Sequence, residues 1–75
     1  MKITRVSTRP NFILEIEAEG GVSGEFDVRP YLDLEAFEAL KDPLEFKKIR
    51  CAGYYIEWEC GADLSADTIE ARLRK

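Results

Sequence analysis

Carboxylates that alternate with apolar residues have the clearest chemical potential in this sequence. Glu15 and Glu17 alternate with Leu14 and Ile16, and a second alternating stretch surrounds Ile56. In a β-strand, alternate residues point to the same face and stand close to their neighbours on adjacent strands. Grouped carboxylates of this kind can bind a cation or a basic protein. The sequence therefore predicts an acidic partner-binding surface, with the candidate residues Glu15, Glu17, Glu25, Glu57 and Glu59.

The same alternation is also typical of a sheet face that is simply exposed to water. Another alternative is a small-molecule or metal-dependent enzyme centred on Glu57, Glu59 and Asp63. A flat sheet lacks the loop carbonyls that Ca²⁺ or Mg²⁺ prefer, and a small core leaves little room for the desolvated cleft that a catalytic acid needs. We therefore predict no catalytic residue, no metal ligand and no cofactor, and the sequence favours a non-catalytic role.

The remaining reactive side chains lack partners. The sequence has no histidine to activate Ser7, Ser23 or Ser65 as a nucleophile. Cys51 and Cys60 supply two of the four ligands that a structural zinc needs, and their expected positions along a hairpin are too far apart for a disulfide. Two reduced thiols are the interpretation that this spacing favours.

The balance of charge disfavours a nucleic-acid-binding protein. Fifteen acidic residues stand against eleven basic ones, which gives a net charge of −4. Nucleic-acid-binding domains normally carry a basic patch instead. The densest basic group, Lys47, Lys48 and Arg50, is also explained by a helix C-terminus, where cations are favourable. A nucleic-acid-associated regulator therefore remains only an alternative.

The length and composition bound the fold class. Seventy-five residues, of which 45% are hydrophobic and 35% charged, predict a single globular domain over residues 1–75. No apolar run approaches the roughly 20 residues that cross a bilayer, and the first residues lack the apolar centre of a signal peptide. We therefore expect a cytoplasmic protein that makes no contact with a membrane.

Turn and cap signals divide the sequence into short strands and helices. Pro10-Asn11 and Gly20-Gly21 separate three alternating stretches, which predict an antiparallel meander, and Asp33, Asp42 and Ser65 are predicted helix N-caps. The predicted strands are residues 2–8, 12–18, 22–28, 49–52 and 54–60, and the predicted helices are residues 34–40, residues 43–48 and a final helix after Ser65. This order predicts an α+β fold in which a small antiparallel sheet of about five strands has two short helices and a C-terminal helix packed on one face.

Assigning the two faces of this sheet predicts which residues form the core. The inner face and the helices that cover it contribute Phe12, Leu14, Ile16, Ala18, Val22, Phe26, Val28, Tyr54, Ile56, Trp58, Cys60, Leu34, Phe37, Leu40, Phe46, Ile69 and Leu73. The outer face then carries seven carboxylates, namely Glu15, Glu17, Glu19, Glu25, Asp27, Glu57 and Glu59.

Several short motifs occur in an order that resembles a known family. They are Phe26-Asp27-Val28-Arg29-Pro30-Tyr31-Leu32, Leu40-Lys41-Asp42-Pro43 with Phe46, Ile56-Glu57-Trp58, and Gly61-Ala62-Asp63-Leu64 before a terminal helix. Their order and spacing are similar to those of the domain-of-unknown-function 2442 family of small prokaryotic proteins. The resemblance implies a small α+β fold without an established enzymatic activity. It also implies a gene arrangement, common in the family, that is similar to a toxin and antitoxin pair.

Together, the acidic surface and the resemblance predict a non-catalytic protein-interaction module. Its partner is expected to be a small protein, for which the acidic surface favours a basic one, and the chain would neutralise it as an antitoxin does. A homodimer is a further possibility, because so small a domain can associate through an exposed strand edge.

Overall fold

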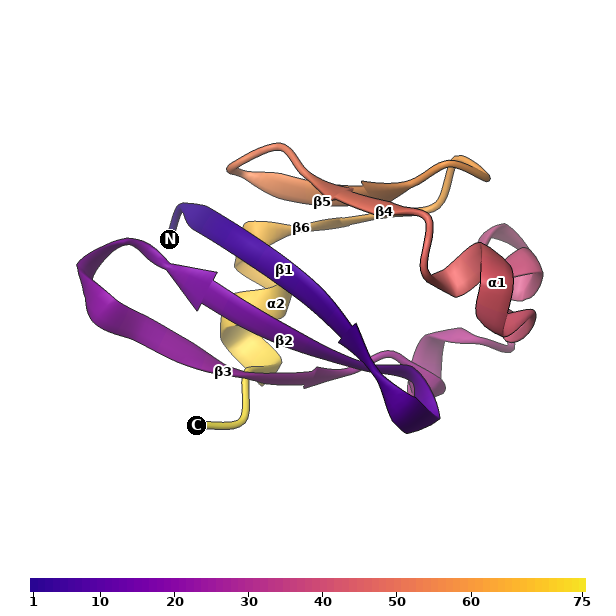
Figure 1. Ribbon diagram of the computed structural model, residues 1–75, viewed down its shortest axis with the longest axis horizontal. Coiled ribbons are helices and arrows are strands. Elements are labelled where there is room, and N and C mark those ends of the chain that lie inside the picture. The colour runs from indigo at the N-terminus through magenta and orange to yellow at the C-terminus, as the bar shows by residue number, and fades with distance from the viewer.

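The alternating N-terminal third folds as the predicted meander. The computed structural model describes residues 1–75 and pairs β1 (Ile3–Arg9), β2 (Ile13–Ala18) and β3 (Val22–Asp27) in the order β1-β2-β3 (Figure 1). Alternate residues of β2, from Leu14 to Ala18, are buried, while Glu15 and Glu17 lie on the opposite face. The predicted α+β character and the antiparallel pairing are thus confirmed.

The prediction of one sheet with about five strands is wrong. A second antiparallel sheet, in the order β4-β5-β6, contains β4 (Ile49–Cys51), β5 (Tyr55–Trp58) and β6 (Asp63–Ser65). The short strand β6 was missed, and it pairs with β5 after a turn at Gly61, which has a φ of +100°.

The edges of the first sheet explain why the two sheets stay separate. Arg74 pairs with Glu25 on the outer edge of β3 through two backbone hydrogen bonds of 2.8 Å. At the other edge, β1 meets the second hairpin through a hydrogen bond from the amide of Ile3 to the carbonyl of Gly53 (2.8 Å). Neither edge therefore continues as a ladder into the second sheet.

Helices connect the two sheets. The 3₁₀ helix η4 (Glu35–Lys41) and the α-helix α1 (Pro43–Phe46) carry the chain from β3 to β4, and short 3₁₀ turns cover Pro10–Phe12, Glu19–Gly21 and Arg29–Tyr31. The C-terminal helix α2 (Ala66–Arg72) runs from β6 toward the edge of β3, so that it links the sheets (Figure 1). None of these helices has the length and apolar character needed to span a membrane.

Two of the three predicted N-caps are confirmed. The side chains of Asp42 and Ser65 accept hydrogen bonds from the amides of Leu44 (2.9 Å) and Thr68 (3.2 Å). Asp33 does not cap η4, which begins only at Glu35, and its exposed carboxylate lies 3.8 Å from Lys41 instead. The segment folds as a 3₁₀ helix, and two of its seven residues, Phe37 and Leu40, are buried.

The core is a cluster of fourteen buried residues drawn from both sheets and the helices. Most of the predicted core residues belong to it, but Leu34 (53% exposed), Tyr54 (68% exposed) and Cys60 lie on the surface. Tyr54 and Cys60 flank a strand of only four residues, so that the alternation of faces breaks down in the adjoining turns. Ala62 and Leu64 are buried in their place.

Candidate functional site

The outer face of the first sheet brings three of the five predicted carboxylates together. Glu15 lies directly opposite Glu25, and Glu17 lies opposite Ser23. Because Ser23 is small, these residues and the backbone of Gly24 surround a shallow hollow of about 230 Å³. The three carboxylates therefore share one depression on the sheet surface, as the alternation predicts.

Two of these three carboxylates have no cationic partner. Glu15 forms an ion pair with Arg9 across the strand pair. No basic group lies within 4.0 Å of the carboxylate of Glu17 or Glu25. Glu25 faces the carboxylate of Glu15 on one side, and like charges at facing positions of a sheet are unfavourable. Arg5 stands opposite Glu17 and Arg74 opposite Glu25, but neither arginine forms an ion pair with these carboxylates. Glu17 and Glu25 are therefore free of ion pairs and open to a cation from outside.

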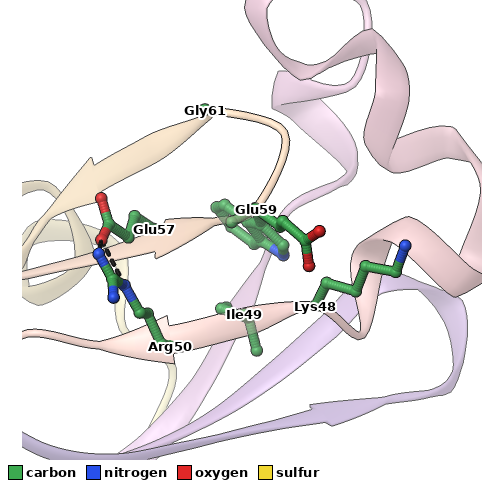
Figure 2. Close-up of a pocket in the computed structure, with 7 residues that line it drawn as sticks. Lys48, Ile49, Arg50, Glu57, Glu59 and Gly61 are labelled. Carbon is green, nitrogen blue, oxygen red and sulfur yellow. Dashed lines mark hydrogen bonds and ion pairs between the residues drawn. The ribbon is translucent and has the colours of Figure 1, made fainter.

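The second sheet carries the other two predicted carboxylates, and cations surround them. Figure 2 shows Glu57 beside Arg50, with which it forms an ion pair, and Glu59 on the same side of the sheet as Lys48. Lys48 binds Glu45 at 2.9 Å, and this hydrogen bond, the charge of Glu45 and that of Glu59 raise the pKa of Lys48. A hollow of about 600 Å³ lies along these residues, but its charges largely compensate one another.

The five predicted residues therefore form two groups on separate sheets rather than one surface. Glu15, Glu17 and Glu25 form the group on the first sheet, which we call the acidic hollow. Glu57 lies opposite Asp63, at the place considered for an enzyme, with Arg50 paired to Glu57. The structure holds no group of three or more His, Cys, Asp or Glu side chains arranged to hold a metal ion.

The basic group considered for nucleic acid is mostly engaged in ion pairs. Lys48 binds Glu45 and Arg50 binds Glu57, whereas Lys47 makes no ion pair and lines a separate cleft beside α1. This cleft, of about 530 Å³, was not predicted. Only turn signals mark it in the sequence, because its walls come from segments more than thirty residues apart. Its lining consists of Thr8, Arg9, Pro10, Asn11, Phe12, Pro43, Phe46 and Lys47.

Both cysteines are free thiols. Cys51 is half-buried, and its Sγ donates a hydrogen bond to the carbonyl of Ile3 at 3.1 Å. Cys60 lies exposed in the turn after β5. Cys51 therefore has a structural contact between the two sheets, and neither thiol adds to the sites described above.

The contact between Asp27 and Arg29 should make the stability of the chain depend on pH. Its carboxylate accepts hydrogen bonds from the side chain of Arg29 (Nε at 3.0 Å and Nη2 at 2.8 Å) and from the Arg29 amide at 2.9 Å. The guanidinium of Arg29 lowers the pKa of Asp27 below its ordinary value of 3.8, which burial only partly opposes. The stabilisation is thus fully present above pH 3.8 and is lost as the pH falls through the lower pKa of the folded state.

This dependence is tested by urea unfolding of the wild type and of Asp27→Asn between pH 6 and roughly pH 2. The wild type should be the more stable of the two at pH 6, and the difference should shrink toward the acid end. The matched control is Glu38→Gln, since Glu38 is exposed and makes no ion pair. A difference between wild type and Asp27→Asn that stays constant with pH would contradict the prediction.

A comparison with protein families identifies the family of the chain. The family model described as "Protein of unknown function (DUF2442)" matches residues 3–75, and the chain therefore belongs to this family. The resemblance inferred from the sequence motifs is confirmed. No curated protein and no solved structure matches the chain.

Proposed function

We propose that this member of the DUF2442 family is a non-catalytic protein-interaction module that binds a basic partner through its acidic hollow. The observation that carries the proposal is that two carboxylates on a hollowed sheet face, Glu17 and Glu25, form no ion pair within the chain. The chain forms seven ion pairs, and none of them involves Glu17 or Glu25. A cation from a partner would relieve the repulsion between the facing residues Glu15 and Glu25.

The spacing of the carboxylates favours an extended basic segment as the ligand. Glu15 and Glu17 are alternate residues of one strand, which places them about 7 Å apart along the strand. Lysines or arginines at alternate positions of an extended segment have the same repeat. Arginine suits such a site best, because its planar guanidinium can bind a carboxylate through two hydrogen bonds. The net charge of −4 would also accelerate the encounter with a basic protein.

The more specific proposal concerns the identity of the partner. Gene arrangements in the family resemble those of toxin and antitoxin pairs, so the partner would be a small basic protein encoded beside this chain. Binding at the acidic hollow would then neutralise the basic surface that the partner uses elsewhere. Co-expression of the chain should relieve any growth defect that the neighbouring protein causes alone.

The test combines capture with a charge-matched control. The tagged chain is expressed in its own organism, and the proteins that co-purify near physiological salt are identified by mass spectrometry. The double variant Glu17→Gln/Glu25→Gln removes the unpaired charges of the hollow and nearly preserves side-chain shape. Glu35→Gln/Glu38→Gln removes two exposed, unpaired carboxylates on η4 and changes the net charge equally.

The expected result is one stoichiometric basic protein that the wild type and the η4 variant retain. Because removing one partner of a charge pair that is buried and hydrogen-bonded in an interface typically costs about 2–5 kcal/mol, the hollow variant should bind the purified partner about 30-fold more weakly or worse. Equal affinity of the two double variants would overturn the assignment of the surface. Recovery of the chain with no basic partner would contradict the proposed function itself.

A further inference from the structure

The cleft beside α1 is built by two segments that are far apart in the sequence. The end of β1 and the turn that follows it form one wall, and α1 with the adjoining Lys47 forms the other. Its volume of about 530 Å³ lies in the range of small-molecule sites. The cleft and the acidic hollow share no lining residue, so an inference about the cleft does not depend on the proposed function.

An unusual backbone conformation builds the aromatic part of this cleft. Asn11 and Phe12 are consecutive left-handed residues, with φ values of 66° and 62°. Asparagine adopts this conformation comparatively easily, but for a bulky residue such as phenylalanine it is a genuine outlier that costs about 1–3 kcal/mol. The conformation directs the ring of Phe12 edge-on against the ring of Phe46, with the ring centroids 5.2 Å apart.

Contacts on both sides hold this strained turn in place. The carbonyl of Phe12 accepts a hydrogen bond from the amide of Val28 (3.0 Å). Phe46 is 4% exposed, and its carbonyl accepts a hydrogen bond from Trp58 Nε1. The aromatic wall is therefore fixed to the core before any ligand arrives, and Pro10 and Pro43 add further rigid apolar surface beside it.

The rim of the cleft is positively charged, although the chain as a whole is acidic. Lys47 is exposed and makes no ion pair, and Arg9 contributes a half-exposed guanidinium that also binds Glu15. No aspartate or glutamate lines this cleft, whereas the hollows on both sheets contain glutamates. Thr8 and Asn11 supply neutral hydrogen-bonding groups.

We propose that this cleft binds a small aromatic carboxylic acid. The aromatic body would lie against the half-buried ring of Phe12, which the buried Phe46 supports from behind, and ring contacts would add to the burial of apolar surface. The carboxylate would lie at the rim and accept charge-assisted hydrogen bonds from Lys47, with Arg9 adding to the positive field. A free lysine beside a preformed aromatic wall thus defines both the charge and the shape of the ligand.

The probe for this site is phenylacetate, with phenylacetamide as its neutral counterpart of the same shape. Each is titrated into the ¹⁵N-labelled full chain while amide resonances are followed by NMR. The Lys47→Gln variant removes the proposed carboxylate partner at an exposed position, so that the fold is preserved. Lys75→Gln is the control, because it removes an exposed lysine outside the cleft.

Phenylacetate should shift the amides of Thr8, Asn11, Phe12 and Lys47 and bind about tenfold more tightly than phenylacetamide. Lys47→Gln should abolish this preference for the charged probe, and Lys75→Gln should retain it. The proposal is overturned if the two probes bind equally to the wild type. It is equally overturned if neither probe shifts these amides, or if the shifts fall on the sheet faces instead.

Discussion

Trp58→Ala is expected to lower the free energy of unfolding more than any other substitution considered for this chain. Trp58 is 2% exposed, and its ring lies 6.0 Å from the rings of both Phe37 and Phe46. It therefore ties the second sheet to η4 and α1 at one point. Truncating a buried aromatic residue to alanine costs about 3–5 kcal/mol. A domain of 75 residues is stabilised by only about 4–11 kcal/mol, so the loss is at least about a quarter of its stability.

A conservative variant separates the hydrogen bond of Trp58 from its packing. Trp58→Phe keeps most of the ring contacts but removes the Nε1–H that donates to the carbonyl of Phe46 at 2.9 Å. Losing that donor should cost about 1–3 kcal/mol, so this variant should fold with reduced stability. Far-UV circular dichroism and urea unfolding measure both effects. Cooperative unfolding of Trp58→Ala near the wild-type midpoint would refute the role assigned to this residue.

Local patterns in the sequence predict the first sheet because turn chemistry and alternation agree there. The turn at Gly20-Gly21 and the alternation from Ile13 to Ala18 fix both the strand pairing and the faces. The second sheet departs from the prediction because its strands have only three or four residues. Two periods of alternation are too few to distinguish a strand such as β6 from a loop. The division into two sheets then depends on tertiary contacts such as the pairing of Arg74 with Glu25.

The sequence predicts which face of the sheet carries the carboxylates, but it does not predict which of them form ion pairs. Alternation places Glu15, Glu17 and Glu25 on one face. The side-chain geometry determines that Arg9 pairs with Glu15, whereas Arg5, which the register places opposite Glu17, forms no ion pair with it. The cleft beside α1 has no local signature beyond the turn signal at Pro10-Asn11. It depends on a turn whose left-handed residues are not glycines, so that the usual sequence signal for such a conformation is absent.

Gly24→Ala is the second substitution expected to have a large effect. Gly24 lies opposite the buried residue Ile16, so a side chain at this position would point toward the core. A Cβ atom there would lie 2.6 Å from the carbonyl oxygen of Arg74 and 2.9 Å from Cγ of Leu73. Rotation of a side chain cannot remove a clash with a backbone carbonyl. The C-terminal segment must therefore shift, and overpacking of this kind costs about 1–3 kcal/mol.

The loss should be concentrated where the C-terminal segment meets β3. In Gly24→Ala, the amides of Glu25 and Arg74, which form the two 2.8 Å hydrogen bonds of this bridge, should exchange with solvent faster than in the wild type. Ser23→Ala, on the exposed face beside it, is the control and should change stability by less than about 0.5 kcal/mol.

A double-mutant cycle then distinguishes the clash from a general effect of alanine in the strand. If the clash is the cause, Gly24→Ala should cost little in a chain truncated after Arg72, because both clashing atoms are gone. An equal cost in the full and truncated chains would show that Gly24 serves the strand itself. The expected non-additivity would instead show that the absence of a side chain at Gly24 lets the C-terminus complete the edge of the sheet. It would also show that the same contact holds the backbone of Glu25, whose side chain faces the acidic hollow.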